Sequence, residues 1–406
     1  MRSFDIILSL SALLGHAAIC VGVLNRSHAV GVSRGLVKSL TVLGFVLLPL
    51  LPAIALWPLL GEGATPAVLQ VTTGGAGWWL AYLIPCWIAA AVVIFRWVRR
   101  ELLRYQPVVL QSNHTLKIDI AERLGHRPVH GLFWRMLTSL PGNQDLIAHF
   151  HEESLELPRL DPALDGLSIL HLSDFHFTGR IGKEFFQELT RLAMENPPDL
   201  IALTGDFVDN ADCIDWIPDA LGALTAGHGV YFVLGNHDPR MRQVPRLRRA
   251  LTGVGFVDLA GRWLKLDING RPVVVAGNEM PWIPPAPEMR DCPAEIGGSR
   301  PFRLLLAHTP DQLPWARQHD FDLMLAGHTH GGQIRLPWIG PIFCPSRHGL
   351  EYASGMFHEP PTALHVSRGI SGETPSRWFC PPEVARLILR SPARGEQRGA
   401  SPSSDR

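Results

Sequence analysis

Five short apolar runs between residues 167 and 330 each end in aspartate, asparagine or histidine residues. The runs are LSILHLSDFH, DLIALTGDFVD, GVYFVLGNHD, FRLLLAHTP and FDLMLAGHTH, and they begin at residues 167, 199, 229, 302 and 321. Uninterrupted Ile, Leu and Val residues are typical of central strands covered on both faces, and helical segments such as Lys183–Asn196 lie between the runs. Because ligands gather beyond the carboxyl ends of strands in α/β layers, the pattern predicts an α/β domain whose polar strand ends meet along one edge.

The last run continues into the motif GHTHGG, which spans residues 327–332. In an extended strand the side chains of residues i and i+2 point the same way, so His328 and His330 are expected to aim at one spot. The flanking glycines allow a tight turn around a bound metal. Taken alone, the motif fits a solvated polar turn equally well.

The polar strand ends together offer carboxylate oxygens, imidazole nitrogens and one amide oxygen. This mixture suits Mn²⁺, Fe²⁺ or Zn²⁺, and the absence of cysteine argues against a structural zinc site. Two such ions about 3.5–4 Å apart can share a carboxylate and a hydroxide, and that hydroxide attacks a phosphoryl group whose oxygens the ions hold. Each end alone has an ordinary interpretation, with Asp206 as a helix cap, Asn236 as a turn residue and His308 as a core histidine. Five ends in succession favour one shared site.

The motifs DFH, GDFVD, GNHD, AHTP and GHTH occur in the order found in the calcineurin-like metallophosphoesterases, which this chain resembles from about Asp165 to Leu389. The later segments GHTHGGQIRLP, VSRG and PPEVARLIL are similar to a bacterial branch of membrane-associated phosphodiesterases and UDP-diacylglucosamine pyrophosphatases. The fold that the resemblance implies is a four-layer αββα sandwich, with a pair of mixed sheets and helices outside.

The resemblance also implies a role for each polar strand end. Two divalent metal ions (Mn, Fe or Zn) are expected, the first bound by Asp174, His176 and His330, the second by Asn236, His308 and His328, with Asp206 bridging both. His237 is expected to face the substrate, stabilise the transition state and protonate the leaving oxygen. Asp209 is expected to orient His237, and Asp238 to be structural.

One segment departs from the family pattern. After the strand VVVAG, where such enzymes often carry an acidic residue, the chain continues as NEMPWIPPAPEMRDCPAEIGG. The proline-rich insertion, residues 281–298, is expected to form a loop near the polar edge. Trp282 and Arg347 either contact substrate or support the fold.

Three long apolar stretches precede the domain and account for much of the 46% hydrophobic content. They run from Ile6 to Leu24, from Ser39 to Leu60 and from Trp78 to Phe95. Each has about the 17–25 residues that a membrane-spanning helix needs. The first could instead be a cleaved signal peptide, but its length and the two stretches that follow favour its retention.

Lysine and arginine near the stretches predict their orientation in an inner or plasma membrane. Arg26, Arg34 and Lys38 follow the first stretch, four arginines follow the third from Arg96 on, and the connection between the second and third carries Glu62 but no basic residue. The N-terminus is therefore expected outside, and everything after Arg96 in the cytoplasm.

The sequence also predicts how the chain divides into domains and which partners it has. We expect a membrane region with three transmembrane helices (1–100), a linker with an entry hairpin (101–162), the metallophosphoesterase domain (163–391) and a disordered tail (392–406). Residues 131–140, GLFWRMLTSL, either lie on the membrane surface or pack against the domain. The formal net charge of zero gives no reason to expect a nucleic-acid partner, and six cysteines without CxxC spacing argue against a zinc ribbon.

The expected function is hydrolysis of phosphodiester or pyrophosphate bonds by a membrane-anchored enzyme with two metal ions, on a lipid-linked or nucleotide-sugar substrate. The bilayer and a phosphorylated small molecule or lipid are the expected partners. A phosphomonoesterase, acting on phosphoproteins or nucleotides, is the alternative enzyme. A membrane sensor that binds a ligand without turnover is the alternative outside enzymes.

Overall fold

The computed structural model describes residues 3–29, 34–56, 78–103 and 109–392. The chain divides into two compact units, one containing Met1–Tyr105 together with Pro345–Gly349, the other containing Gln106–Cys344 and Leu350–Arg406. Of the sequence predictions, the end of the second apolar stretch at residues 57–60 and nearly all of the C-terminal tail lie outside the described residues.

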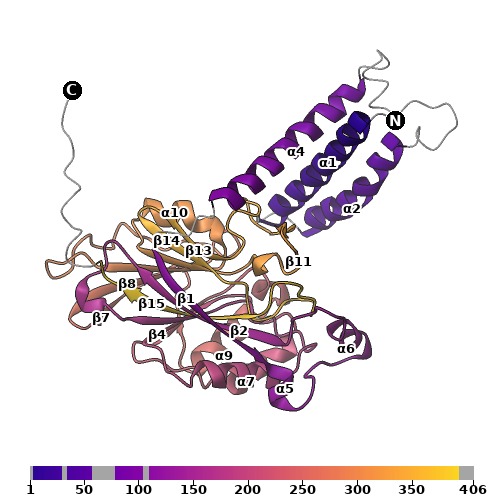
Figure 1. Cartoon of the computed structure of the whole chain (residues 1–406). Coiled ribbons are helices and arrows are strands. Elements are labelled where there is room, and N and C mark those ends of the chain that lie inside the picture. Colours follow the sequence, from indigo (N-terminus) through magenta and orange to yellow (C-terminus); the bar gives the residue numbers. More distant parts are fainter. Residues whose placement is uncertain (1–2, 30–33, 57–77, 104–108, 393–406) are drawn as a thin grey trace, which may run out of the picture. The chain divides into compact units, whose positions relative to one another are not determined.

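The first unit contains three long apolar helices, as predicted: α1 (Ser3–Ala29), α2 (Arg34–Leu56) and α4 (Trp78–Leu103) (Figure 1). The segments Ile7–Ala29, Gly35–Ala53 and Leu80–Val98 are long and apolar enough to cross a membrane. Polar side chains on these helices bond to neighbouring helices: the Trp87 indole donates to the Leu8 carbonyl at 3.0 Å, and Nε2 of His16 lies 3.1 Å from the Leu47 carbonyl. His16 therefore joins α1 to α2.

The second unit is built on two mixed β-sheets. The seven-stranded sheet has the order β1 (Leu110–Asp119), β2 (Ile147–Glu156), β15 (Glu383–Arg390), β3 (Ser168–Leu172), β4 (Leu200–Thr204), β5 (Val230–Val233) and β6 (Val257–Asp258). The six-stranded sheet has the order β13 (Gly355–Glu359), β14 (Thr362–Val366), β10 (Leu323–Ala326), β9 (Phe302–Ala307), β8 (Arg271–Asn278) and β7 (Trp263–Ile268). The five predicted apolar runs form β3, β4, β5, β9 and β10. Neighbours among them pair in parallel.

Side chains that alternate between the two faces of each strand form three hydrophobic layers. Leu170 of β3 packs with α7 (Lys183–Ala193) and α9 (Val244–Gly253) on one side, whereas its neighbour Ile169 packs against β9 across the space between the sheets. Leu305 of β9 packs with α10 (Leu313–Gln318) on the far side of the second sheet. Figure 1 shows α10 above the sheets and α7 and α9 below them. The predicted αββα layering is confirmed, and each fully buried leucine contributes roughly 2 kcal/mol.

The segment before β3 differs from the sequence prediction. The sequence LKIDIAERLG, residues 116–125, predicts a short helix that ends at Gly125. In the structure residues 116–119 belong to β1, and only α5 (Ile120–Leu124) is helical, ending at Gly125 with φ 73°. The alternation in DLIAHFHEESLELPRL, residues 145–160, predicts a hairpin that enters the main sheet. This segment instead forms the single strand β2, which pairs antiparallel with β1 and parallel with β15. Residues 116–119 form a strand because pairing with β2 satisfies their backbone groups, whereas a short helix is only marginally stable in water.

Of the two interpretations that the sequence left open for residues 131–140, the structure supports packing against the domain. In α6 (Leu132–Thr138), Trp134 packs against the core, and the Arg180 guanidinium lies 4.3 Å from the centre of its ring. Leu132, Phe133 and Met136 on the same helix remain exposed.

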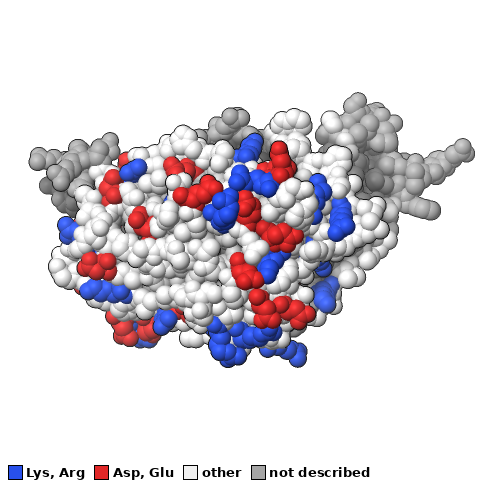
Figure 2. Space-filling view, turned by 90° about the horizontal axis from the view of Figure 1, so that it is seen from below, with Lys and Arg blue, Asp and Glu red and all other residues white. Residues whose placement is uncertain are grey.

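The face of the molecule that points down in Figure 1 carries charged side chains of both signs. Figure 2, which looks at the molecule from below, shows lysine and arginine interspersed with aspartate and glutamate. Ion pairs such as Arg123–Glu188 and Lys183–Asp219 join side chains of opposite sign at the surface. On this face the charges are mixed and do not gather by sign.

Candidate metal centre

The predicted site residues meet at the carboxyl ends of strands from both sheets. Nδ1 of His308, which follows β9, donates to the Thr204 carbonyl of β4 at 2.6 Å. This bond joins the sheets and fixes the histidine tautomer, because the proton on Nδ1 leaves Nε2 with its lone pair. That Nε2 lies 3.2 Å from Oδ2 of Asp206 and 3.1 Å from Oδ1 of Asn236.

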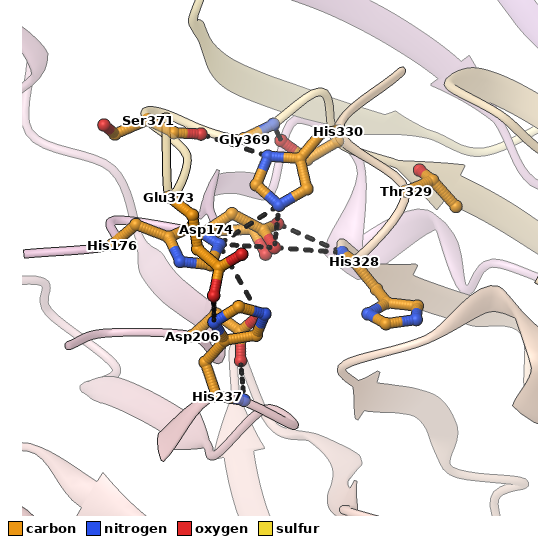
Figure 3. Close-up of polar contacts among 12 residues, drawn as sticks. Asp174, His176, Asp206, His237, His328, Thr329, His330, Gly369, Ser371 and Glu373 are labelled. Atoms are coloured by element: carbon orange, nitrogen blue, oxygen red, sulfur yellow. Dashed lines mark hydrogen bonds and ion pairs between the residues drawn. The ribbon is translucent and has the colours of Figure 1, made fainter. Parts of the chain in front are cut away.

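Seven predicted metal ligands come together around Asp206. Two donor groups have the spacing of metal sites, one formed by Asp174, His176, Asp206 and His330, the other by Asp206, His308 and His328, and the donor atoms in each group lie within 4.8 Å of one another. Asn236 adjoins the second group through His308. Figure 3 shows Asp174, His176 and His330 converging, with His328 on the other side of Asp174. Asp206 alone belongs to both groups.

The contacts within the cluster test whether it fits cations. Nε2 of His176 and Nε2 of His330 face each other at 3.1 Å, so a proton or another cation must lie between the two lone pairs. Their Nδ1 atoms are already used, by Asp209 and by the Ser371 carbonyl respectively. Nε2 of His328 is buried and has no hydrogen-bond partner. The donor set therefore fits divalent metal ions.

Burial and neighbouring charges set the protonation of the cluster. Burial lowers the pKa of His330 to about 3 and that of His328 well below its ordinary value. Burial raises the pKa of Asp206, but His308 and His237 outweigh it, so the pKa lies well below the ordinary value. In His176 the neighbouring carboxylates of Asp174 and Asp209 outweigh burial and raise the pKa, so metal binding would displace a proton there.

The backbone at the strand ends is strained. Five of the predicted ligands have positive φ: Asp174 at 54°, His176 at 44°, Asp206 at 54°, His328 at 72° and His330 at 50°. Residues other than glycine rarely adopt this conformation, and when they do it is often at functional sites. It also corrects the sequence argument for the GHTH motif. The chain leaves the strand at Ala326, so strand alternation does not aim the two histidines, and they join different donor groups.

Two glycines are required by close packing around the carboxylates. A Cβ atom on Gly327 would lie 2.3 Å from Oδ2 of Asp174, and one on Gly235 would lie 2.2 Å from Oδ1 of Asp206. Both distances are far inside van der Waals contact. The glycines of GHTH and GNHD therefore make room for the ligands of the cluster.

His237 and Asp209 lie beside the shared carboxylate. Oδ1 of Asp209 lies 2.5 Å from Nδ1 of His237, and its Oδ2 lies 2.6 Å from Nδ1 of His176. These three residues also have metal-like spacing, but both carboxylate oxygens are engaged by ring N–H groups, so Asp209 acts as a hydrogen-bond acceptor. Nε2 of His237 is then left on the side of Asp206, 4.0 Å from its Oδ2.

Some residues around the cluster were not identified from the sequence. Arg240 and Glu373 pair at 2.8 Å and reach the His237 ring. Glu279, fully buried, accepts from the Leu234 backbone N–H at 2.6 Å and pairs with Arg248, also at 2.6 Å. Glu279 thereby supports the segment that leads to Asn236. Its position two residues after VVVAG was visible, but nothing local indicated its partners.

The proline-rich insertion contributes a wall of the cluster. The ring of Trp282 lies 4.8 Å from that of His328 and 5.7 Å from that of His308, centre to centre. The loop is therefore near the polar edge, as predicted. Arg347 falls within Pro345–Gly349, which belongs to the unit of the apolar helices.

Two mixed sheets between helices, with a buried aspartate–histidine cluster at their strand ends, define a metal-dependent hydrolase. A family model described as calcineurin-like phosphoesterase matches residues 167–332. The chain is 31% identical over 228 residues to the phosphodiesterase YaeI of Escherichia coli, covering 54% of this chain and 81% of that protein. The chain belongs to the calcineurin-like metallophosphoesterases and is a metal-dependent phosphoesterase.

Two further relatives share the same region. The uncharacterized metallophosphoesterase YkuE of Bacillus subtilis is 29% identical over 245 residues, covering 59% of this chain and 85% of YkuE. The UDP-2,3-diacylglucosamine pyrophosphatase LpxG of Chlamydia muridarum is 27% identical over 294 residues, covering 58% of this chain and 89% of LpxG.

Proposed function

We propose that the protein hydrolyses a phosphodiester or pyrophosphate bond with two divalent metal ions, of which manganese is the first to test. The observation that supports this most is the membership of Asp206 in two adjacent donor groups. One carboxylate shared by two groups is what a pair of ions requires. The assignments of individual residues below are part of the proposal.

Seven residues would hold the ions. Asp174, His176 and His330 would bind the first, Asn236, His308 and His328 the second, and Asp206 both. When bound, the ions would activate a water molecule as nucleophile and neutralise charge on the phosphoryl oxygens. The residues of the chain supply a buried site in which these charges are weakly screened.

His237 would donate a proton to the leaving oxygen. With its Nδ1 proton held by Asp209, the ring can carry a second proton on Nε2, on the side of Asp206. Asp209 stabilises the charged ring and keeps its orientation, since its second oxygen is fixed by His176. Arg240 and Glu373 contact the same ring at Nδ1, the nitrogen that faces Asp209, and so would also help to hold its orientation.

The substrate class follows from the apolar helices and the relatives. YaeI is named a phosphodiesterase and LpxG a UDP-2,3-diacylglucosamine pyrophosphatase, and helices long enough to cross a membrane precede the domain. We propose a lipid-linked or nucleotide-sugar substrate for this chain. A phosphomonoesterase is the alternative.

Substrate preference and His237 can be tested together on the purified full-length protein loaded with Mn²⁺. We expect a bis-aryl phosphodiester to be hydrolysed faster than the matching monoester. We expect His237→Ala to lower kcat/KM by about 10²–10³-fold, because general acid catalysis contributes about that much, with unchanged metal content by elemental analysis. The loss should be greater for an alkoxide than for a nitrophenolate leaving group, because only the former needs a proton.

The matched control is His228→Ala, at the other end of β5. It should leave kcat/KM within about twofold, as surface changes away from a site usually do. Turnover of the monoester alone would favour the alternative enzyme. Equal losses for both leaving groups would remove His237 from the role of proton donor.

We also propose that the catalytic domain lies in the cytoplasm, from the basic residues near the ends of the apolar helices. Arg26 lies in the last turn of α1 and Arg34 begins α2, whereas Arg96 begins the basic end of α4. Because basic residues favour the cytoplasmic side, a reporter that is active only in the cytoplasm should be active when fused after Arg406. Activity only of an exported reporter would reverse the orientation.

A further inference from the structure

A short hairpin next to the metal cluster exposes an unusual number of large apolar side chains. It spans residues 334–343, with β11 (Arg335–Leu336) pairing antiparallel with β12 (Gly340–Pro341). Its exposed residues, with relative exposure, are Ile334 46%, Leu336 40%, Trp338 88%, Ile339 53%, Ile342 41% and Phe343 38%. Scattered apolar residues are normal on a surface, but a cluster of this size marks an interaction site. We call residues 334–343 the apolar hairpin.

The apolar hairpin is firmly connected to the cluster. It begins four residues after His330, and the Arg335 backbone N–H donates to the Trp378 carbonyl at 2.9 Å. Gln333, just before it, donates to the Thr374 carbonyl at 2.7 Å, and Cys380 Sγ donates to the His330 carbonyl at 3.1 Å. The backbone that carries a proposed metal ligand therefore also carries the apolar hairpin.

We propose that the apolar hairpin inserts into the surface of a lipid bilayer. The chain itself supplies the reason to choose lipid as the occupant. Pro345–Gly349, just after the apolar hairpin, belongs to the unit of the candidate membrane spans. The chain thus leads from the C-terminal side of the apolar hairpin directly into that unit.

The composition of the apolar hairpin suits the boundary between headgroups and acyl chains. Trp338, the most exposed of its residues, is of the type enriched at membrane interfaces. Arg335, in β11, can reach lipid phosphates while Leu336 and Ile339 face the acyl chains. A protein surface would satisfy the apolar side chains equally well, so the experiment must separate the two.

The consequence for the reaction rests on the proposed function. If the apolar hairpin lies in the interface, the cluster next to His330 lies near the level of the headgroups. The substrate is then an amphiphile that stays in the bilayer, with its phosphate presented to the cluster. A water-soluble phosphodiester would gain nothing from the apolar hairpin.

The first test measures insertion without measuring activity. The full-length protein, with Trp338→Cys and Cys20→Ala, is spin-labelled and placed in lipid nanodiscs, and the label's accessibility to oxygen and to a water-soluble nickel complex is compared. A label at Glu195, whose side chain is 54% exposed in the same domain, is the control. We expect oxygen to be favoured at position 338 and nickel at position 195. Equal nickel accessibility at both positions, or spin–spin coupling between copies through position 338, would overturn the proposal.

The second test measures whether the apolar hairpin promotes hydrolysis of a substrate in the bilayer. We expect Trp338→Glu, and more mildly Leu336→Ser, to lower hydrolysis of a bilayer-embedded phosphodiester by about tenfold, with hydrolysis of a soluble bis-aryl phosphodiester within about twofold. Equal losses on both substrates would mean that the apolar hairpin only supports the fold. If the unaltered protein hydrolyses neither substrate, the proposed function fails, and the spin-label result still decides whether the apolar hairpin inserts.

Discussion

Asp206→Asn is expected to abolish turnover, with a fall in kcat/KM of about 10⁴-fold or more, equivalent to roughly 5–6 kcal/mol of transition-state stabilisation. The reason is the position of Asp206 in both donor groups. Asparagine keeps the size of the side chain and an oxygen for the His237 backbone N–H, which Asp206 accepts at 2.7 Å. It removes the negative charge that both ions would share, so the affinity for both should fall.

The measurement is metal content by elemental analysis and kcat/KM over a range of Mn²⁺ concentrations. Asp199→Asn is the matched control, because Asp199 lies at the opposite end of β4 and its carboxylate accepts from the Ser168 backbone N–H and hydroxyl. It should bind two ions and turn over within about twofold of the unaltered protein. An Asp206→Asn protein that retains two ions and most of its activity would disprove the shared carboxylate.

The layers and the strand ends could be predicted because their signals are local. Apolar runs of strand length identify β3, β4, β5, β9 and β10 without reference to the rest of the chain. Parallel pairing then brings their carboxyl ends to one edge. The presence of two sheets was expected from the family resemblance, and the division of the strands between them was not predicted, since nothing in an isolated run says which sheet it joins.

The parts that could not be predicted depend on distant partners or on backbone conformation. Glu279 bonds to Leu234 and Arg248, and Glu373 meets Arg240 across 133 positions of the chain. No pattern near either glutamate indicates these contacts. The left-handed backbone at His328 and His330 was also missed, because residues other than glycine rarely adopt it and no local pattern indicates it.

Asp238→Ala is expected to destabilise the domain by roughly 3–5 kcal/mol, the largest effect we expect from a residue outside the donor groups. Asp238 is fully buried, and its carboxylate accepts four backbone N–H groups, from Asp206 at 3.0 Å, Phe207 and Gly235 at 2.8 Å and Val208 at 3.2 Å. Alanine leaves four buried donors without partners, and each costs about 1–3 kcal/mol if water cannot replace the oxygen. Partial relaxation makes the sum smaller than four full penalties.

Thermal unfolding of the metal-free protein measures this effect, and we expect a fall in Tm of about 10 °C. The Tm of Asp238→Asn should lie between that of the unaltered protein and that of Asp238→Ala, since the single oxygen of asparagine serves two of the four donors. Asp215→Ala, which removes a 75% exposed carboxylate paired with Arg246 at 2.7 Å, should change stability by less than about 0.5 kcal/mol. If Asp238→Ala and Asp215→Ala unfold at the same temperature, the Asp238 carboxylate does not hold these loops together.

Adding metal distinguishes a residue that supports the site from one that binds the ions. Asp238 joins the loop of Asp206 to that of Gly235 but supplies no oxygen to either donor group. Because ions bind only the folded protein, saturating Mn²⁺ should restore part of the Tm that Asp238→Ala loses. The same Mn²⁺ should raise the Tm of Asp206→Asn little, since that variant lacks the shared ligand. Equal recovery in both variants would place the ions somewhere other than around Asp206.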